Sequence, residues 1–354
     1  MLNTFSKIIL FVLLPIQFAS AQLIPIDEAE LSAMTGQAFI NIDESHDNSS
    51  GLDFTKVTLG LDVDTLLNAD KLDLGNYDRG GAGSDILIDN FALGKIDSNG
   101  NVVPFSIRDP FIELAFDEDA GKQNLVGVRI GFGGAKGALS GTIKSLTGNV
   151  NVDIKDTAQA LSEADGDFIG DILTALGPSL LGNSPLVASA VLVDSAGNPN
   201  SIRASKVGLK NGTEIEIDTR NVNGFSRGIL SFTAGILPNT YCVDSSAWFS
   251  GPCDTSINFI SQGCEVDGGI ATCFNLENYN TLEVGNKKSD GTFDFAEGLS
   301  LSFQSERIAW RNSNGVISEK GAFLNVPNGG LEVTLKEALK GTDRVRTRYV
   351  DPYF

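Results

Sequence analysis

Apolar and polar residues alternate with a period of two through most of this chain. The segments KVTLGLDVD (56–64) and LVGVRIGFGG (125–134) each place four apolar side chains at alternate positions. Successive side chains of a β-strand point to opposite faces, so this spacing gives a strand one apolar face. The same pattern recurs in NVNVDI, TEIEID, ILSFTAGI, LSLSFQSERIAW and LEVTL. Any fold that buries these residues is built mainly from strands.

Turn signals separate the predicted strands: DSNGN (97–101), SAGNPN (195–200), KNGT (210–213) and KSDGT (288–292). Asn-Gly and Asp-Gly pairs favour the tight turns of β-hairpins. With 39 glycines in the chain, we expect a mainly β protein with an elongated or curved antiparallel sheet. A β-sandwich, a groove-like sheet and a β-helix all fit this rhythm of short strands.

Two helices are expected within this β pattern. Near the N-terminus, Asp27 and Glu30 fit a capping box, and Gly36 can adopt the left-handed conformation that ends a helix. These residues predict a short helix over residues 28–35. A strand then begins at Ala38. An amphipathic helix is expected near 157–181, where it would cover an open edge of the sheet or face lipid or a partner. Its apolar or partner face consists of Phe168, Ile172, Leu173 and Leu176.

The first residues predict export. Lys7 precedes the apolar run from Ile8 to Leu14, and Ala19-Ser20-Ala21 has the small-x-small form that signal peptidase cleaves. A membrane anchor is the alternative, but the run is shorter than the roughly 20 residues that span a bilayer. We expect a signal peptide over 1–21, followed by a capping helix and first strand (22–43), a glycine-rich β domain with the inserted helix (44–230) and a disulfide-bearing β region (231–354).

The four cysteines, Cys242, Cys253, Cys264 and Cys273, lie close together in the chain. In an exported protein this clustering favours two disulfides. Three connectivities exist, and we prefer 242 with 253 and 264 with 273 because each closes a short loop. A zinc site is the alternative, but no C-x-x-C pair is present.

Several kinds of chemistry find no support in the sequence. His46 is the only histidine and lies in a hydrophilic stretch, and G-x-S-x-G, P-loop and dinucleotide-binding motifs are missing. A net charge of −19 argues against nucleic acid as a partner. Calcium is not expected at Asp97, because Arg108 occupies the position of the bidentate glutamate of an EF-hand. We therefore expect no cofactor and no enzymatic activity.

One short motif resembles a known group of proteins. The stretch ELSAMTGQAFINID (30–43) contains L-S-x-x-T-G-Q-A, which is similar to the start of secreted gammaproteobacterial proteins of unknown function or assigned to pilus systems. The resemblance implies a periplasmic, outer-membrane surface or extracellular location, with envelope or pilus proteins as partners. It carries over no catalytic residue. The motif residues are Leu31, Ser32, Thr35, Gly36, Gln37 and Ala38.

Three classes of function remain open. The first is a structural or adhesive surface protein, such as a pilus-associated component, that self-associates or binds partners through strand edges. The second is a carrier of lipid or another apolar ligand in a groove of the sheet. The third is a hydrolase with two carboxylates, for which acidic residues are abundant but their placement is unknown. We expect the first class, with the carrier as the alternative.

Overall fold

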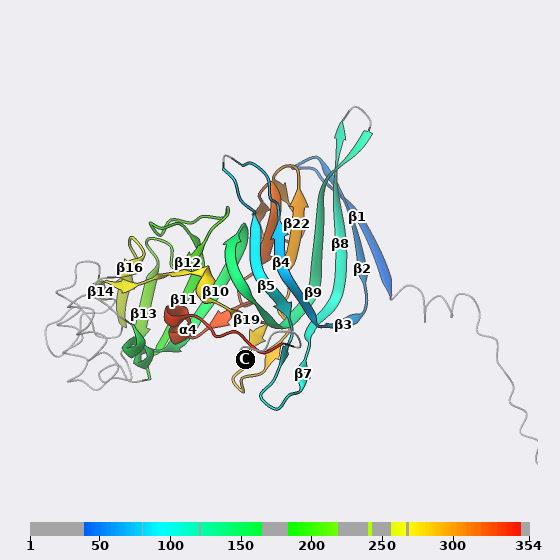
Figure 1. The fold of residues 1–354 in the computed structure, drawn as a ribbon. Coiled ribbons are helices and arrows are strands. Elements are labelled where there is room, and N and C mark those ends of the chain that lie inside the picture. The colour runs from blue at the N-terminus through cyan, green and yellow to red at the C-terminus, as the bar shows by residue number, and fades with distance from the viewer. Residues whose placement is uncertain are drawn as a thin grey trace, which may run out of the picture. The chain divides into compact units, whose positions relative to one another are not determined.

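Figure 1 shows the fold in a computed structural model. The structure describes residues 39–79, 81–119, 122–164, 183–218, 240–242, 256–266 and 269–347. Strands dominate these residues, and most of them belong to one large, mixed sheet that is not closed. The expected fold class, mainly β, is therefore confirmed. None of the helices in the described part of the chain has the length and apolar character needed to cross a membrane.

Six antiparallel strands lie side by side in the first part of the sheet. Strand β3 (Asp62–Thr65) lies beside the beginning of β8, next to the end of β2. The six strands, in spatial order, are β1 (Ile40–Asp47), β2 (Leu52–Leu59), β8 (Phe105–Asp119), β9 (Lys122–Leu146), β22 (Ser300–Gln304) and β25 (Gly321–Val326).

Strand β9 is long enough to serve two parts of the sheet, as Figure 1 shows. Its first half pairs with β8 and β22, and its second half pairs with β5 (Ile86–Leu93) and β19 (Thr281–Val284). Strand β4 (Leu67–Leu74) pairs with β5. Strand β9 thus contributes side chains to both the main core and a smaller apolar cluster.

Strand β10 (Gly148–Thr157) makes the sheet mixed. It runs parallel to β25 and to β26 (Glu332–Val333), and antiparallel to β11 (Pro185–Val193). The antiparallel arrangement expected from the hairpin signals is wrong for these two pairs, because strands distant in sequence meet here without a hairpin. Beyond β11 lie β12 (Lys206–Gly208), β13 (Glu214–Asp218), β14 (Thr240–Cys242), β15 (Ser256–Ile260) and β18 (Cys273–Asn275).

Short hairpins fill connections in the described residues. They pair β6 (Lys95–Ile96) with β7 (Val102–Val103), β16 (Glu265–Val266) with β17 (Ile270–Ala271), β20 (Asn286–Lys287) with β21 (Phe293–Asp294), and β23 (Ile308–Ala309) with β24 (Ile317–Ser318). The carboxylate of Asp97 accepts hydrogen bonds from the backbone of Asn99 and Asn101, 2.9 and 2.8 Å long. The DSNGN stretch is therefore a side-chain-capped turn between β6 and β7.

The main core collects alternate apolar side chains from β5, β9, β10, β11 and β25. Full burial of one such side chain stabilises the fold by about 1.5–3 kcal/mol. A smaller cluster of Leu52, Phe54, Ala115, Ile308 and Trp310 fixes the β23–β24 hairpin to the sheet. Members of the main core include Ile86, Ile88, Ile143, Val152, Leu192 and Val326.

Three strand predictions need correction. The first strand, expected to end at residue 43, continues to Asp47, and only residues 48–51 connect β1 to β2. The stretch 56–64 is interrupted at Gly60 and Leu61, between β2 and β3. The alternation over 126–132 fails at Val126, because a shift in the register between β8 and β9 makes it an extra residue that packs against the smaller cluster.

The segment LEVTL was predicted as one strand, but only Glu332 and Val333 are extended. Helix α4 (Leu335–Lys340) follows, with Thr334 as its N-cap. The Thr334 hydroxyl accepts from the backbone of Glu337, whose carboxylate accepts from the backbone of Thr334. This capping box satisfies two backbone donors and outweighs the strand pattern of a few residues.

The two expected helices fall largely outside the described residues. The N-terminal helix over 28–35 lies wholly outside them. Of the helix expected near 157–181, the structure describes only its beginning, which is a 3₁₀ helix, η1 (Ala158–Glu163), rather than an α-helix. The boundary placed near residue 230 also lies outside them. Across that boundary β12 pairs with β18 and β13 with β15.

Candidate functional site

A cleft of about 720 Å³ opens on the face of the sheet where β2, β8, β9, β22, β25 and β10 lie side by side. We call it the polar cleft. Its cations are Lys56, Arg129 and Arg311, and among the described residues that line it Glu297 is the only carboxylate. A lining of amides and cations is typical of a site for a hydrophilic ligand. Its asparagines are Asn149, Asn151, Asn312, Asn314, Asn325 and Asn328.

Strand register assembles the floor of the polar cleft. Phe111 of β8 lies opposite Gly131 of β9, and Gly131 lies opposite Ser300 of β22. Ser300 lies opposite Asn325 of β25, which lies beside Asn149 of β10. Directly opposed residues share a face of a sheet. A Cβ atom at residue 131 would lie 2.3 Å from Phe111 Cζ, so glycine is needed for the ring to lie across β9.

Three asparagine side chains on this floor form a chain of hydrogen bonds. The amide of Asn151 donates to Asn149 over 3.3 Å, and that of Asn149 donates to Asn325 over 2.9 Å. Asn325 donates to the carbonyl of Gly298 over 2.9 Å. Each bond fixes the orientation of one carboxamide. The floor therefore presents oriented donors and acceptors to whatever enters the cleft.

A row of alternating charge crosses the sheet beside this floor. Asp43 of β1, Lys56 of β2, Glu113 of β8 and Arg129 of β9 are consecutive cross-strand neighbours. Glu113 is fully buried and pairs with Arg129, which also donates to the carbonyl of Arg311 over 2.9 Å. Burial lowers the pKa of Arg129, and the charge of Glu113 opposes that shift. This pair is therefore held inside the protein, next to the cleft.

Lys56 has no carboxylate partner within ion-pair distance among the described residues. Its Nζ lies 3.9 Å from the centroid of the Phe111 ring, which is a cation–π contact. Burial, as the largest cause, lowers the pKa of Lys56. Arg311, by contrast, forms an ion pair with Asp43, with 3.0 Å between Nη1 and Oδ2. Lys56 is thus the lining cation whose charge is left uncompensated by direct pairing.

The turn between β23 and β24 forms one wall of the polar cleft. Trp310, at its start, is buried against Phe54, with 5.9 Å between ring centroids. Asn312 and Asn314 have φ angles of 54° and 51°, the left-handed region that asparagine tolerates better than most residues. The buried tryptophan therefore positions a turn whose asparagines line the opening.

Three buried polar atoms beside the polar cleft have no hydrogen-bond partner within the described residues. They are Glu113 Oε1, Arg129 Nε and Trp310 Nε1. Buried polar atoms are normally paired with protein or with ordered water. Their concentration at one place indicates that water or a ligand completes the hydrogen bonding there.

Sequence reasoning did not find these residues. The available signal was a single charge within a short run of uncharged residues: Lys56 in FTKVTL, Glu113 in FIELAF and Arg129 in VGVRIG. A lone charge in such a strand must either find a partner or face solvent. Which of the two applies depends on strand register, which the pattern does not give.

The residues singled out from the sequence lie elsewhere. The motif Leu31, Ser32, Thr35, Gly36 and Gln37 and the face formed by Phe168, Ile172, Leu173 and Leu176 are outside the described residues, as is Cys253. The backbone of Cys242 is part of β14. His46 is on β1 with its ring half exposed, 2.8 Å from Asp53.

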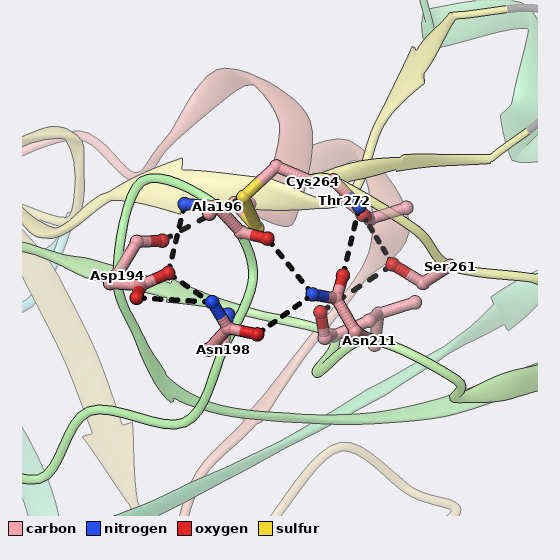
Figure 2. The surroundings of a disulfide bond; sticks show 10 residues. Asp194, Ala196, Asn198, Asn211, Ser261, Cys264 and Thr272 are labelled. Atoms are coloured by element: carbon pink, nitrogen blue, oxygen red, sulfur yellow. Dashed lines mark hydrogen bonds between the residues drawn. A yellow bond between two sulfur atoms is a disulfide. The ribbon is translucent and has the colours of Figure 1, made fainter.

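One predicted disulfide is present. Cys264 and Cys273 are bonded, with 5.0 Å between their Cα atoms, and they flank the β16–β17 hairpin. Figure 2 shows that the amide of Asn211 beside it donates to Ala196 and Asn198. The pairing preferred for these two cysteines is confirmed. The crosslink holds this hairpin next to the turn at Asp194.

We expect loss of this crosslink to be measurable. Replacing both Cys264 and Cys273 by serine should lower the free energy of unfolding by about 2–3 kcal/mol, the loop entropy of a crosslink that closes a short loop. Urea unfolding of the double variant and of the native chain gives the difference. A change below about 0.5 kcal/mol, as for a neutral surface substitution, would mean that the disulfide does not restrain the unfolded chain.

The fold and the polar cleft define a mainly β protein with an open, amide-rich binding surface. No protein-family model matches the chain, and comparisons with curated proteins and with solved structures found no match. The function of the chain is therefore inferred from the chemistry of the cleft and from the sequence.

Proposed function

We propose that this chain is an exported, non-enzymatic protein of the cell surface with a structural or adhesive role, and that it holds its target in the polar cleft. The observation that carries the proposal is the cleft itself, with oriented asparagines on its floor and asparagines on its rim. The signal-like N-terminus and the L-S-x-x-T-G-Q-A motif support export and a surface location.

The lining favours binding over catalysis. Carboxamides donate and accept hydrogen bonds but do not act as general acids or bases at neutral pH. Hydrolysis of a glycoside by the usual route needs two carboxylates facing one bond, whereas Glu297 is the only carboxylate among the described lining residues. The donor set is therefore that of a receptor for a polar target.

Partner proteins of the envelope or of a pilus, and self-association, remain part of the proposal. Within the described residues β1 pairs only with β2, so its other edge offers backbone donors and acceptors. Three carboxylates, Asp43, Glu44 and Asp47, lie along this strand. Pairing of two copies of β1 would bring like charges together, so the edge suits a partner strand that carries basic residues.

No observation favours the carrier alternative. The apolar cavity inside the main core, lined by residues such as Ile143, Leu146 and Leu324, has a volume of about 90 Å³. Sites for small molecules usually enclose about 300–1,000 Å³. The carrier of lipid stays a prediction that rests on the segment 168–176, outside the described residues.

The adhesive role can be tested on whole cells. Cells that produce the chain should be retained on a layer of their own extracellular matrix about tenfold better than cells lacking the gene, because many copies of the chain attach each cell. Asn328→Trp, which places a large ring at the rim of the cleft, should abolish this difference.

Asn124→Trp is the matched control, because Asn124 is exposed on β9 and is not among the residues that line the cleft. It should leave retention unchanged. Equal retention of cells with and without the gene would contradict the adhesive role. If Asn328→Trp and Asn124→Trp reduced retention equally, the cleft would have no part in adhesion.

A further inference from the structure

The cations that line the polar cleft are paired except at one residue. Arg129 pairs with Glu113, and Arg311 pairs with Asp43. These are the groups that face Lys56 from β1, β8, β9 and the β23–β24 turn. Glu297, the carboxylate of the lining, is exposed, makes no ion pair among the described residues and is not one of the charges that act on Lys56. Lys56 makes no ion pair among the described residues. The cleft therefore offers one cation to an incoming ligand, which suits one negative charge.

The rim of the cleft supplies groups that are free to bind. The side chains of Asn312, Asn314 and Asn328 line it and make no hydrogen bond within the described residues. A carboxamide both donates and accepts, as does a sugar hydroxyl. A ligand with several hydroxyl groups could therefore satisfy these side chains together.

We propose that the target is a carboxylated saccharide, an inference that rests on the proposed function. Its carboxylate pairs with Lys56 Nζ, and its hydroxyl groups bind the asparagines of the cleft. A phosphate group would favour a fork of arginines or a helix N-terminus, whereas the arginines here are paired. A peptide would favour a strand edge or apolar anchoring pockets, whereas the side chains that line the cleft are mainly amides, hydroxyls and charges.

The test uses the mature chain on an array that prints uronic-acid and sialic-acid oligosaccharides, each beside its neutral methyl ester, together with acidic peptides. The native chain should bind at least one acid about tenfold more tightly than its ester. Lys56→Met should remove this preference, Lys56→Arg should retain most of it, and Lys71→Met on β4 should leave it unchanged.

Two further readouts separate binding from folding. The Lys56→Met variant removes a partly buried charge and keeps an unbranched side chain over Phe111, so its Tm should not fall by more than about 2 °C. Binding of the acid should weaken as pH rises through the pKa of Lys56, which burial lowers below 10.5. This loss should come at lower pH than for an ordinary lysine.

The outcomes distinguish this inference from the proposed function. Equal binding of acids and esters, tighter binding of acidic peptides, or no binding of any acid would overturn the inference. The adhesion of cells and its loss in Asn328→Trp would be untouched by those results. The proposed function, in turn, would be overturned if cells with and without the gene were retained equally.

Discussion

Replacing Asp85 by alanine is expected to lower the free energy of unfolding by about 3–5 kcal/mol, because it leaves two largely buried arginines without their common partner. The Asp85 side chain is fully buried. It lies 3.3 Å from Arg79 Nη1 and 3.1 Å from Arg203 Nε, and it accepts a hydrogen bond from the backbone of Ala322 over 3.0 Å. Domains are stable by only about 5–15 kcal/mol, so this loss is a large part of the stability of a typical domain.

This ion cluster joins three segments that are far apart in sequence. Arg203 also donates to the carbonyls of Gly81 and Tyr77, 2.9 and 2.7 Å away. Gly321 has a φ of 97°, and a Cβ there would lie 2.1 Å from the Asp85 carboxylate. The backbone approaches the carboxylate so closely that no other side chain fits beside it.

The measurement is urea unfolding followed by tryptophan fluorescence. Asp85→Asn keeps the shape and should cost less than alanine, because part of the hydrogen bonding survives. Asp62→Ala is the control. Its carboxylate is exposed and lies 3.6 Å from Arg108, and surface pairs contribute at most about 1 kcal/mol. Similar losses for Asp85→Ala and Asp62→Ala would contradict a structural role for the buried carboxylate.

Replacing Glu113 by alanine should also cost about 3–5 kcal/mol, because Arg129 would stay buried beneath the cleft without a counter-charge. Glu113 is fully buried and Arg129 is 6 % exposed. Chemical denaturation of the purified variant gives the change in free energy.

The pair itself can be tested by removing both charges. Glu113→Leu combined with Arg129→Met should recover most of the loss, because replacement of a buried ion pair by apolar residues is often neutral. If the double variant is as unstable as Glu113→Ala, the cost arises from packing and not from the unpaired charge. The double variant should also lose the hydrogen bond between Arg129 and Arg311, and with it the placement of the cleft wall.

Local patterns predicted much of the fold. Alternation located strands such as 149–154 and 214–218, because the period of two is a property of neighbouring residues. The capping box at Thr334 and Glu337 was equally readable, but a strand pattern was preferred there. The breaks at Gly60 and Val126 could not be read, because they depend on how β8 aligns with its neighbours.

The polar cleft was beyond reach of the same reasoning. Lys56, Glu113 and Arg129 are each a single charge among uncharged neighbours in the sequence, and only the register of β2, β8 and β9 brings them together. A one-residue shift in the register of any one of these strands would send its charged residue to the opposite face. The asparagines gather from β10, β25 and the β23–β24 turn, which no local pattern connects.

The sequence by itself determined the mainly β class and favoured the pairing of Cys264 with Cys273 among three connectivities, because side-chain alternation and short loops are local properties. The tertiary structure alone decided the parallel pairing of β10, the burial of Asp85 between two arginines and the assembly of the polar cleft. These features join residues that are distant in the chain. They are set by the packing and register of whole strands, to which each residue contributes only a small part of the free energy.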